Sequence, residues 1–326
     1  MIATDVSQSI PEPEPNAFYS LWDQRQSKAR LWAFAAASLV FGLAYAPNFR
    51  VLIATWQEDP NYSHGFLVIP IAVWILWQCL AGAKPESTPG AVPAPWWGWV
   101  FLMAVLAVRA IAYEWNRLWL ENATMLPAIA CLTWTFGGWP LLHRVWQAIA
   151  YLVFMLPLPP DINNLIALPL QRLATSCSCF LLQLSGLWAI QEGNVINLNT
   201  PHGMMPLDVA LACNGLRMLM TMVATVIAIL ILIPLPTWKR IVLLVSVVPI
   251  ALLSNMIRIV TTGWCYYLIT GPNAKAWAHD LSGWLMMPLA LLLVVLELGI
   301  LSWLVPDEDE LGGGDVKSVL PMLTAR

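Results

Sequence analysis

The chain has 326 residues, of which 59% are hydrophobic and only 11% are charged, and its net charge is -3. A soluble domain carries about a quarter charged residues, so this composition excludes an ordinary water-soluble fold and indicates a membrane protein. The small negative charge excludes a nucleic-acid partner, which would require a basic surface. The 19 tryptophans favour the interface of a bilayer.

The membrane-spanning segments follow from the apolar stretches, taken in chain order. The first 30 residues are polar and proline-rich, without the apolar core of a cleavable signal, and predict a cytoplasmic tail. Spanning takes about 20 apolar residues, and we predict about eight transmembrane helices, at residues 31–47, 66–81, 96–113, 123–140, 145–158, 213–233, 240–262 and 281–304. The predicted fold class is an all-α polytopic membrane protein with a transmembrane domain over 31–305 and a cytoplasmic tail over 306–326.

One connection is much longer than the others, and it covers residues 159–212. Within it, residues 163–186 carry polar side chains at helical spacing, which predicts a helix lying in the membrane interface. Gly193 and Asn194 stand between alternating residues and indicate the tight turn of a small hairpin. We expect this extracytoplasmic segment to be either a lid or substrate platform, or a structural cap.

The lysines and arginines predict the orientation of the chain. With the N-terminus in the cytoplasm, nine of them fall in cytoplasmic segments, four fall outside, and three lie within spans. Cytoplasmic loops carry the excess of positive charge, so we expect both termini in the cytoplasm. The three arginines within spans are Arg109, Arg217 and Arg258.

Three predicted spans bring reactive side chains to the same outer boundary. Cys213 lies twenty residues before Ile233, and this is about 30 Å along a helix, the thickness of the hydrocarbon core. Arg258 lies eighteen residues after Arg240, about 27 Å by the same rise. His279 directly precedes the last span. The sequence therefore predicts a thiol, a guanidinium and an imidazole at similar depth.

Each of these residues has an ordinary structural explanation when it is taken alone. A membrane cysteine usually behaves as a small hydrophobe, and an interfacial arginine usually snorkels or forms an ion pair. A histidine near the start of a helix is usually a surface residue. Three unrelated structural residues have no reason to converge on one side, so the convergence favours a site. The helix dipole at Cys213 favours the thiolate, which is the nucleophilic form.

Further residues are predicted to support the site or bind its substrate, and these are Arg217, Asn255, His64 and Asn214. Arg217 lies one turn deeper than Cys213 on the same helix face, and it is expected to pair with Asp208 or with a substrate carboxylate. His64 and His202 also lie outside and compete with His279 for the role of the imidazole. The cysteines follow no metal-binding spacing, and we predict neither a metal nor a cofactor.

The motifs around these residues resemble those of the exosortases and archaeosortases. "ALACNGLR", "SNMIRI" and "HDLSG" each stand at the outer end of a predicted span, in the order and spacing of that family. "NYSHGFLVIPI" after the first span and "LPLPP" before the outer segment also match its layout, and the resemblance covers roughly 55–305. The chain departs from the family at Leu211 and Asn214, where members often have an acid and a serine around the cysteine.

The resemblance implies a membrane-embedded cysteine transpeptidase or protease of the bacterial inner membrane, with its active site on the extracytoplasmic side. Its expected partners, within the lipid membrane, are exported proteins with a PEP-CTERM-like tail, made of a short motif, a transmembrane helix and a basic cluster. Such an enzyme cleaves this C-terminal sorting signal and transfers the protein to an acceptor. The resemblance implies that Cys213 is the nucleophile, Arg258 the stabiliser of the oxyanion, and His279 the acid and base.

Two other functions are compatible with the composition. A transporter or flippase for an anionic or lipid-linked substrate would use arginines inside the membrane, but the sequence has neither inverted repeats nor paired broken helices. A different membrane enzyme is the second alternative, but the sequence contains neither G-x-S-x-G nor H-E-x-x-H. A purely structural subunit would leave the convergence of the three side chains unexplained.

Overall fold

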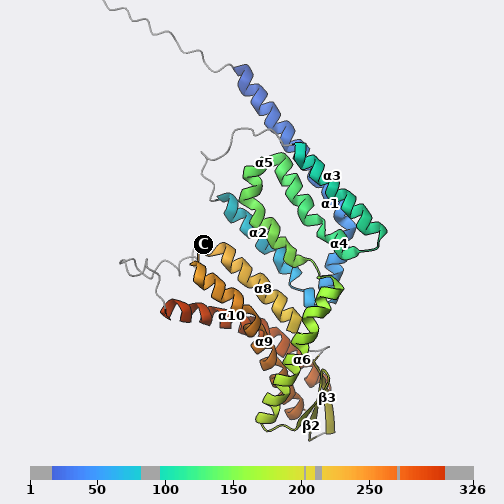
Figure 1. Ribbon diagram of the computed structural model, residues 1–326, viewed down its shortest axis with the longest axis vertical. Helices are drawn as coiled ribbons and strands as arrows, with labels where there is room; N and C mark the ends of the chain where they lie inside the picture. The colour runs from blue at the N-terminus through green and yellow to red at the C-terminus, as the bar shows by residue number, and fades with distance from the viewer. Residues whose placement is uncertain (1–16, 82–95, 202, 210–214, 270–271, 305–326) are drawn as a thin grey trace, which may run out of the picture. The chain divides into compact units, whose positions relative to one another are not determined.

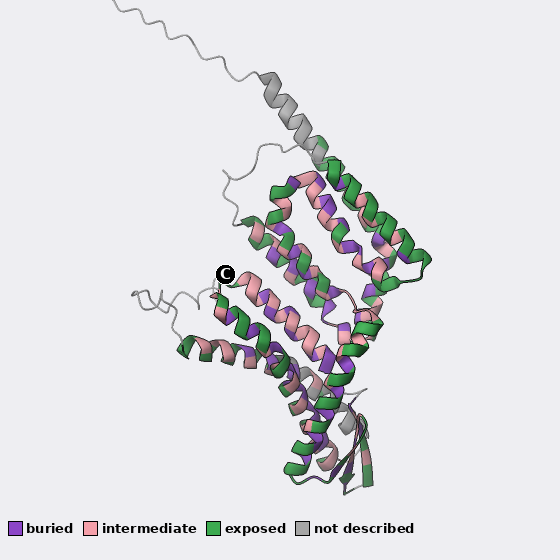
Figure 2. Ribbon diagram, in the orientation of Figure 1, coloured by how far each residue is buried: buried purple, intermediate pink, exposed green. Residues whose placement is uncertain are grey.

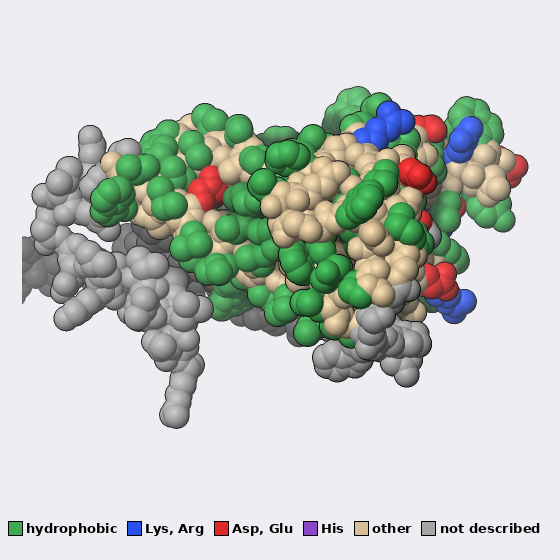
Figure 3. All heavy atoms as spheres, turned by 90° about the horizontal axis from the view of Figure 1, so that it is seen from below, with side chains coloured by type: hydrophobic (Ala, Val, Ile, Leu, Met, Phe, Trp, Pro, Cys, Tyr) green, Lys and Arg blue, Asp and Glu red, His purple; other side chains and the backbone are tan. Residues whose placement is uncertain are grey.

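A computed structural model describes residues 17–81, 96–201, 203–209, 215–269 and 272–304 (Figure 1). The side chains of 17–28, 30, 272–280, 282, 284 and 287 lie outside this description. Almost all of the described chain is helical, apart from one small antiparallel sheet. Exposed residues follow most of the described helices (Figure 2), and many of them are large hydrophobic residues. Hydrophobic side chains are spread over the face seen in Figure 3, with few charged ones between them. Such faces suit contact with lipid, because lipid tails are as apolar as these side chains.

Seven helical stretches of the described residues are long and apolar enough to cross a membrane. They are Leu31–Glu58, Pro60–Ala81, Trp96–Glu114, Leu118–Met155, Pro160–Leu184, Gly215–Leu232 and Thr237–Leu268. The last helix of the described chain, α10 (Pro272–Leu304), adds a shorter apolar part, Pro288–Leu304. The predicted all-α polytopic membrane fold is confirmed.

The fourth predicted span and most of the fifth fall within one of these stretches, Leu118–Met155. It contains α4 (Leu118–Ala123), α5 (Met125–Tyr151) and the short 3-10 helix η3 (Leu152–Met155). Gly138 has φ 69° and ψ -179° and breaks α5 into two helical segments. Glycine adopts this left-handed φ without the steric cost that a Cβ would impose. The stretch therefore holds two helical segments that meet at Gly138, where two separate spans were predicted.

The helix predicted to lie in the interface, at 163–186, is α6 (Pro160–Leu184). Its first residue is a proline, which suits the first turn of a helix because no intrahelical partner is needed there. The helix itself is confirmed. It is also long and apolar enough to cross a membrane, so its length and composition do not favour the interface over a crossing.

The described residues separate into two compact units, each made of two parts of the chain. The first comprises residues 1–50 and 86–143, and the second comprises residues 51–85 and 144–326. Two helices, α1 (Ala17–Glu58) and α5, continue from one unit into the other. The predicted boundaries of tails and membrane domain, 1–30, 31–305 and 306–326, concern the position of the membrane and stay predictions.

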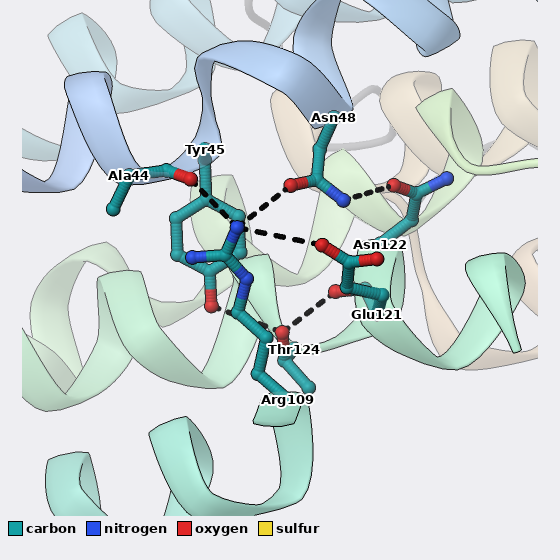
Figure 4. A network of polar contacts seen from close by, with 7 residues as sticks. All are labelled: Ala44, Tyr45, Asn48, Arg109, Glu121, Asn122 and Thr124. Carbon is teal, nitrogen blue, oxygen red and sulfur yellow. Dashed lines mark hydrogen bonds and ion pairs between the residues drawn. The ribbon is translucent and has the colours of Figure 1, made fainter. Parts of the chain in front are cut away.

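A polar network around Arg109 joins the helices of the first unit (Figure 4). Arg109 lies in α3 (Trp96–Glu114), and its Nη2 donates to Ala44 O at 2.6 Å, to Asn48 Oδ1 at 3.0 Å and to Glu121 Oε1 at 3.4 Å. Its guanidinium also lies 4.0 Å from the centroid of the Tyr45 ring. Arg109 and Glu121 form an ion pair, and an arginine with this many partners is a structural element of the unit.

Three helices of the second unit share an apolar core, and these are α8 (Gly215–Leu232), α9 (Thr237–Leu268) and α10. The core is formed by Met218, Met222, Val226, Leu243, Val247, Ala251, Met286, Ala290 and Val294. Each helix contributes three residues spaced by four positions, which is the spacing that lines one face of a helix.

The sheet of the second unit consists of β1 (Ala189–Glu192), β2 (Val195–Thr200) and β3 (Gly203–Asp208), in the antiparallel order β1-β2-β3. The predicted turn at Gly193 and Asn194 is confirmed, since Glu192 pairs with Val195 and Gly193 has φ 63°. The third strand was not predicted. The sheet packs on α6 and α9, and we call the end of the second unit at which it lies the sheet end (Figure 1).

Candidate active site

A layer of buried polar side chains interrupts the apolar face of α9. The layer consists of Ser254, Asn255, Arg258 and Thr262. On one side of it, Ala251 belongs to the core shared with α8 and α10. On the other, Trp264 packs against a second core, which contains Ile259 together with residues of α6 and the sheet. Buried polar groups cost free energy unless they have partners, so a polar layer between two apolar cores marks a candidate site.

Arg258 is the charged residue of this layer, and only 7% of it is exposed. Its guanidinium lies against the backbone of α10 at Gly283, where an added Cβ would be 3.2 Å from Nη2 and 3.6 Å from Cζ. Its Nε has no hydrogen-bond partner among the described residues. Arg109, by contrast, has acceptors on three residues. Of these two arginines, Arg258 is therefore the one with a buried donor left over for a ligand.

Asn255 connects the polar layer to the beginning of α8. A Cβ added at Gly215 would be 3.5 Å from Asn255 Nδ2 and 4.0 Å from Leu170 Cβ of α6. Gly215 is the first described residue of α8 and stands two positions after Cys213 in the chain. The predicted supporting residue Asn255 thus lies beside the segment that leads out of the cysteine motif.

The structure places the other predicted site residues to different extents. Cys213, Asn214 and His202 lie outside the described residues. His279 lies in α10, although its side chain is outside the description, and it precedes Gly283 by one helical turn, about 6 Å. Arg217 is half-buried in the first turn of α8 and interacts with a neighbouring group. Its predicted pairing with Asp208 stays a prediction.

Residues of the three predicted motifs nevertheless meet at the polar layer. Gly215 of "ALACNGLR" lies against Asn255 of "SNMIRI", and Gly283 of "HDLSG" lies against Arg258. The helices that carry these motifs, α8, α9 and α10, also share one apolar core. The motifs are far apart in the sequence, so this proximity is a property of the fold.

His64 has a structural position in the second unit. It is buried, and its Nε2 lies 3.1 Å from Phe154 O of η3. A carbonyl oxygen only accepts, so Nε2 carries the proton. Trp56 donates from Nε1 to the next carbonyl, Met155 O, at 3.0 Å. Both side chains therefore hold the end of η3, where the chain turns towards α6.

Tyr62 fastens the other side of this turn. Its hydroxyl donates to Asn163 Oδ1 of α6 at 2.9 Å and accepts from the Leu158 amide at 3.3 Å. Tyr62 belongs to the 3-10 helix η1 (Pro60–Tyr62), which packs against α8, as does α2 (Gly65–Ala81). Sequence reasoning missed Trp56 and Tyr62, although Tyr62 stands inside the "NYSHG" motif that it singled out.

The fold and the polar layer define a class of protein: a polytopic helical membrane protein with a candidate site of polar residues where α8, α9 and α10 meet. The sequence profile described as "Transmembrane exosortase" matches residues 56–296. The chain belongs to the transmembrane exosortase family, and membership implies a membrane transpeptidase-type function. The matched region includes Cys213, Arg258 and His279. No curated protein and no solved structure matches the chain.

The positions of the histidines lead to a ranking of their variants. His279→Gln is expected to lower turnover about 100-fold or more, because it removes a group able to transfer a proton. His64→Gln is expected to stay within about threefold of the parent, because the glutamine amide is also a donor for Phe154 O. Kinetics of both variants, beside His202→Gln, test the ranking. An inactive His64→Gln beside an active His279→Gln would transfer the proton-transfer role to His64.

Proposed function

We propose that this protein is a cysteine transpeptidase that cleaves the C-terminal sorting signal of exported proteins and transfers them to an acceptor. The proposed substrate tail contains a short motif such as Pro-Glu-Pro, a transmembrane helix and a basic cluster. The proposed location is the bacterial inner membrane, with the sheet end on the extracytoplasmic side and both termini in the cytoplasm. Family membership supports the type of reaction.

One structural observation supports the proposal most strongly, and it is the position of Arg258. A buried guanidinium, whose Nε has no partner among the described residues, stands in a polar layer against Gly283 of α10, and Gly283 follows His279 by one helical turn. Acyl transfer develops negative charge on a carbonyl oxygen, and a preorganised cationic donor in a site that excludes water stabilises this charge. The layer also lies beside Gly215, two positions after Cys213.

The proposed reaction divides into two acyl transfers. The Cys213 thiolate attacks the scissile carbonyl carbon, and the resulting oxyanion is stabilised by Arg258. Collapse of this intermediate breaks the C–N bond, and His279 gives a proton to the leaving amine while the substrate stays bound as a thioester. The acceptor, which is an amine, a hydroxyl group or water, then attacks the thioester as His279 takes its proton. The new acyl bond forms and Cys213 is released.

The substrate assay tests this function directly. The chain is co-expressed with an exported reporter that ends in the proposed tail, and the C-terminus of the reporter is determined by mass spectrometry. A reporter shortened at one bond in the presence of the chain, and full-length in its absence, is the expected result. A reporter that keeps its full tail beside correctly inserted protein contradicts the proposal.

The proposed orientation has its own test, in a variant without the six native cysteines. An impermeant thiol reagent on intact cells is expected to label Asn199→Cys and to leave Arg240→Cys unlabelled. Both positions are exposed, Asn199 in the sheet and Arg240 near the beginning of α9, so a difference in labelling reports the side of the membrane. Arg240→Cys should react after the cells are opened, which is the control. The reverse pattern in intact cells would invert the orientation.

A further inference from the structure

Gly283 occupies a place on α10 where the Arg258 guanidinium lies against the helix backbone. An added Cβ there would be 3.2 Å from Nη2, 3.6 Å from Cζ and 4.0 Å from Nε. These three distances show that the guanidinium of Arg258 lies directly beside the position that a side chain at residue 283 would occupy. The group that would have to move is the guanidinium at the far end of the Arg258 side chain, because the other partner is the backbone of α10.

We infer that Gly283 is a positioning residue, which fixes the guanidinium of Arg258 by leaving its own side-chain volume empty. The inference rests on the proposed function, because it assumes that Arg258 acts on the substrate carbonyl. It adds a specific role for the glycine of the "HDLSG" motif, whose histidine is one turn away. Gly283 itself touches no reacting atom and acts only through Arg258.

The geometry limits how Arg258 can respond to a side chain at position 283. A contact of 3.2 Å is tighter than ordinary van der Waals contact, so the guanidinium must move by a few tenths of an ångström. Arg258 is buried, and the apolar cores on either side of its layer restrict the directions of this movement. Stabilisation of an oxyanion depends on the position of the donor, so a small displacement of the guanidinium lowers the rate of the chemical step.

Two other glycines of the same bundle provide matched comparisons. Gly299 also lies in α10, and an added Cβ there has nothing within 4 Å. Gly215 of α8 would bring its Cβ to 3.5 Å from Asn255 Nδ2, which is an ordinary contact. Of these three positions, only Gly283 meets the cationic head of Arg258 at a distance that forces a movement.

A purely structural role for Gly283 predicts a different result. Alanine is a better helix former than glycine, so Gly→Ala inside a helix stabilises it wherever there is space. If the glycine served only the packing of α9 against α10, its replacement would lower the thermal stability and the bound fraction of substrate together with the rate. If it positions Arg258, the rate falls while both of the other quantities stay at the parental level.

The experiment measures single-turnover cleavage of a tailed reporter, pull-down of the uncleaved reporter and thermal unfolding in detergent, for the full-length protein. Gly283→Ala is expected to cleave about tenfold more slowly, since small misplacements of catalytic groups have effects of this size. Its reporter binding and melting temperature should equal those of Gly299→Ala, which should cleave at the parental rate. A parental rate for Gly283→Ala overturns the inference, as does a rate loss accompanied by equal losses of binding and stability.

A double-mutant cycle identifies the residue through which Gly283 acts. In an Arg258→Lys background, Gly283→Ala should change the rate by less than about twofold, because the group that it displaces is absent. A tenfold effect in that background as well would show that Gly283 acts independently of Arg258, and the inference would be wrong. The parent and Cys213→Ala are measured in parallel. If the parent cleaves the reporter and Cys213→Ala does not, the proposed function stands whatever the result for Gly283→Ala. If the parent itself is inactive, both the proposed function and the inference about Gly283 are wrong.

Discussion

Cys213→Ala is expected to abolish cleavage of a tailed reporter, with a loss of more than about 10⁴-fold, while the protein stays folded and inserted. Removal of a covalent nucleophile costs an enzyme this much because the remaining groups cannot form the acyl intermediate. A small thiol contributes little packing, so its loss should leave the fold intact. The measurement is single-turnover cleavage beside thermal unfolding, with uncleaved precursor expected to accumulate in the membrane.

Two companion variants make this result specific. Cys213→Ser should be nearly as inactive, since a hydroxyl group has no accessible anionic form at neutral pH. Cys79→Ala, in the last turn of α2, should cleave at the parental rate, because Cys79 is a free cysteine far along the helix from "NYSHG". Substantial turnover by Cys213→Ala would rule out covalent catalysis at this position.

Arg258→Lys is expected to lower the chemical rate about 10²–10³-fold with little loss of substrate binding. The loss of one oxyanion donor costs roughly 3–4 kcal/mol in the transition state. Lysine keeps the charge but lacks the planar fork of donors, so it does not replace the Nε and Nη groups that face the polar layer. Single-turnover cleavage, with pull-down of the uncleaved reporter, separates the rate from the binding.

Arg217→Lys and Arg109→Lys are the matched controls for this prediction. Arg217 stands in the first turn of α8 and should affect binding or folding more than the chemical rate. Arg109 is tied to Glu121 and to backbone and amide acceptors, so its replacement should lower the melting temperature of the protein. If Arg258→Lys cleaves at the parental rate, the proposed catalytic role of Arg258 is wrong.

The sequence predicted what depends on local pattern and on the thickness of a bilayer. Apolar spacing placed the helices that carry the three motifs. The helical rise placed Arg258 near one end of its span, which stays a prediction, since α9 continues past Arg258 to Leu268. The Gly193 turn followed from its flanking alternation. Each of these features is decided by residues within one element or one turn.

What the sequence did not predict depends on contacts between distant segments or on a single backbone angle. The partners of Arg109 come from two other helices, α1 and α4, and nothing near "AVRAI" indicates them. Two spans were predicted where α5 lies, but not the position of the break between them, because it rests on the left-handed φ of Gly138, whereas the neighbouring Gly137 keeps helical geometry. The strand β3 reads as "GMMPLD", and its proline hides the strand pattern, because proline is depleted in sheets.

The Nε of Arg258, which has no partner among the described residues, also affects the stability of the protein. A buried polar group without a partner lowers the free energy of unfolding, and a charge does so more than a neutral group. Under the proposed catalytic role of Arg258, the fold gives up stability for activity, which is a recurrent compromise at active sites. Apolar residues of similar volume at buried ionic positions often leave a protein as stable or more stable. Arg258→Met is therefore a rational starting point for an inactive, longer-lived form of the protein that captures its substrate uncleaved.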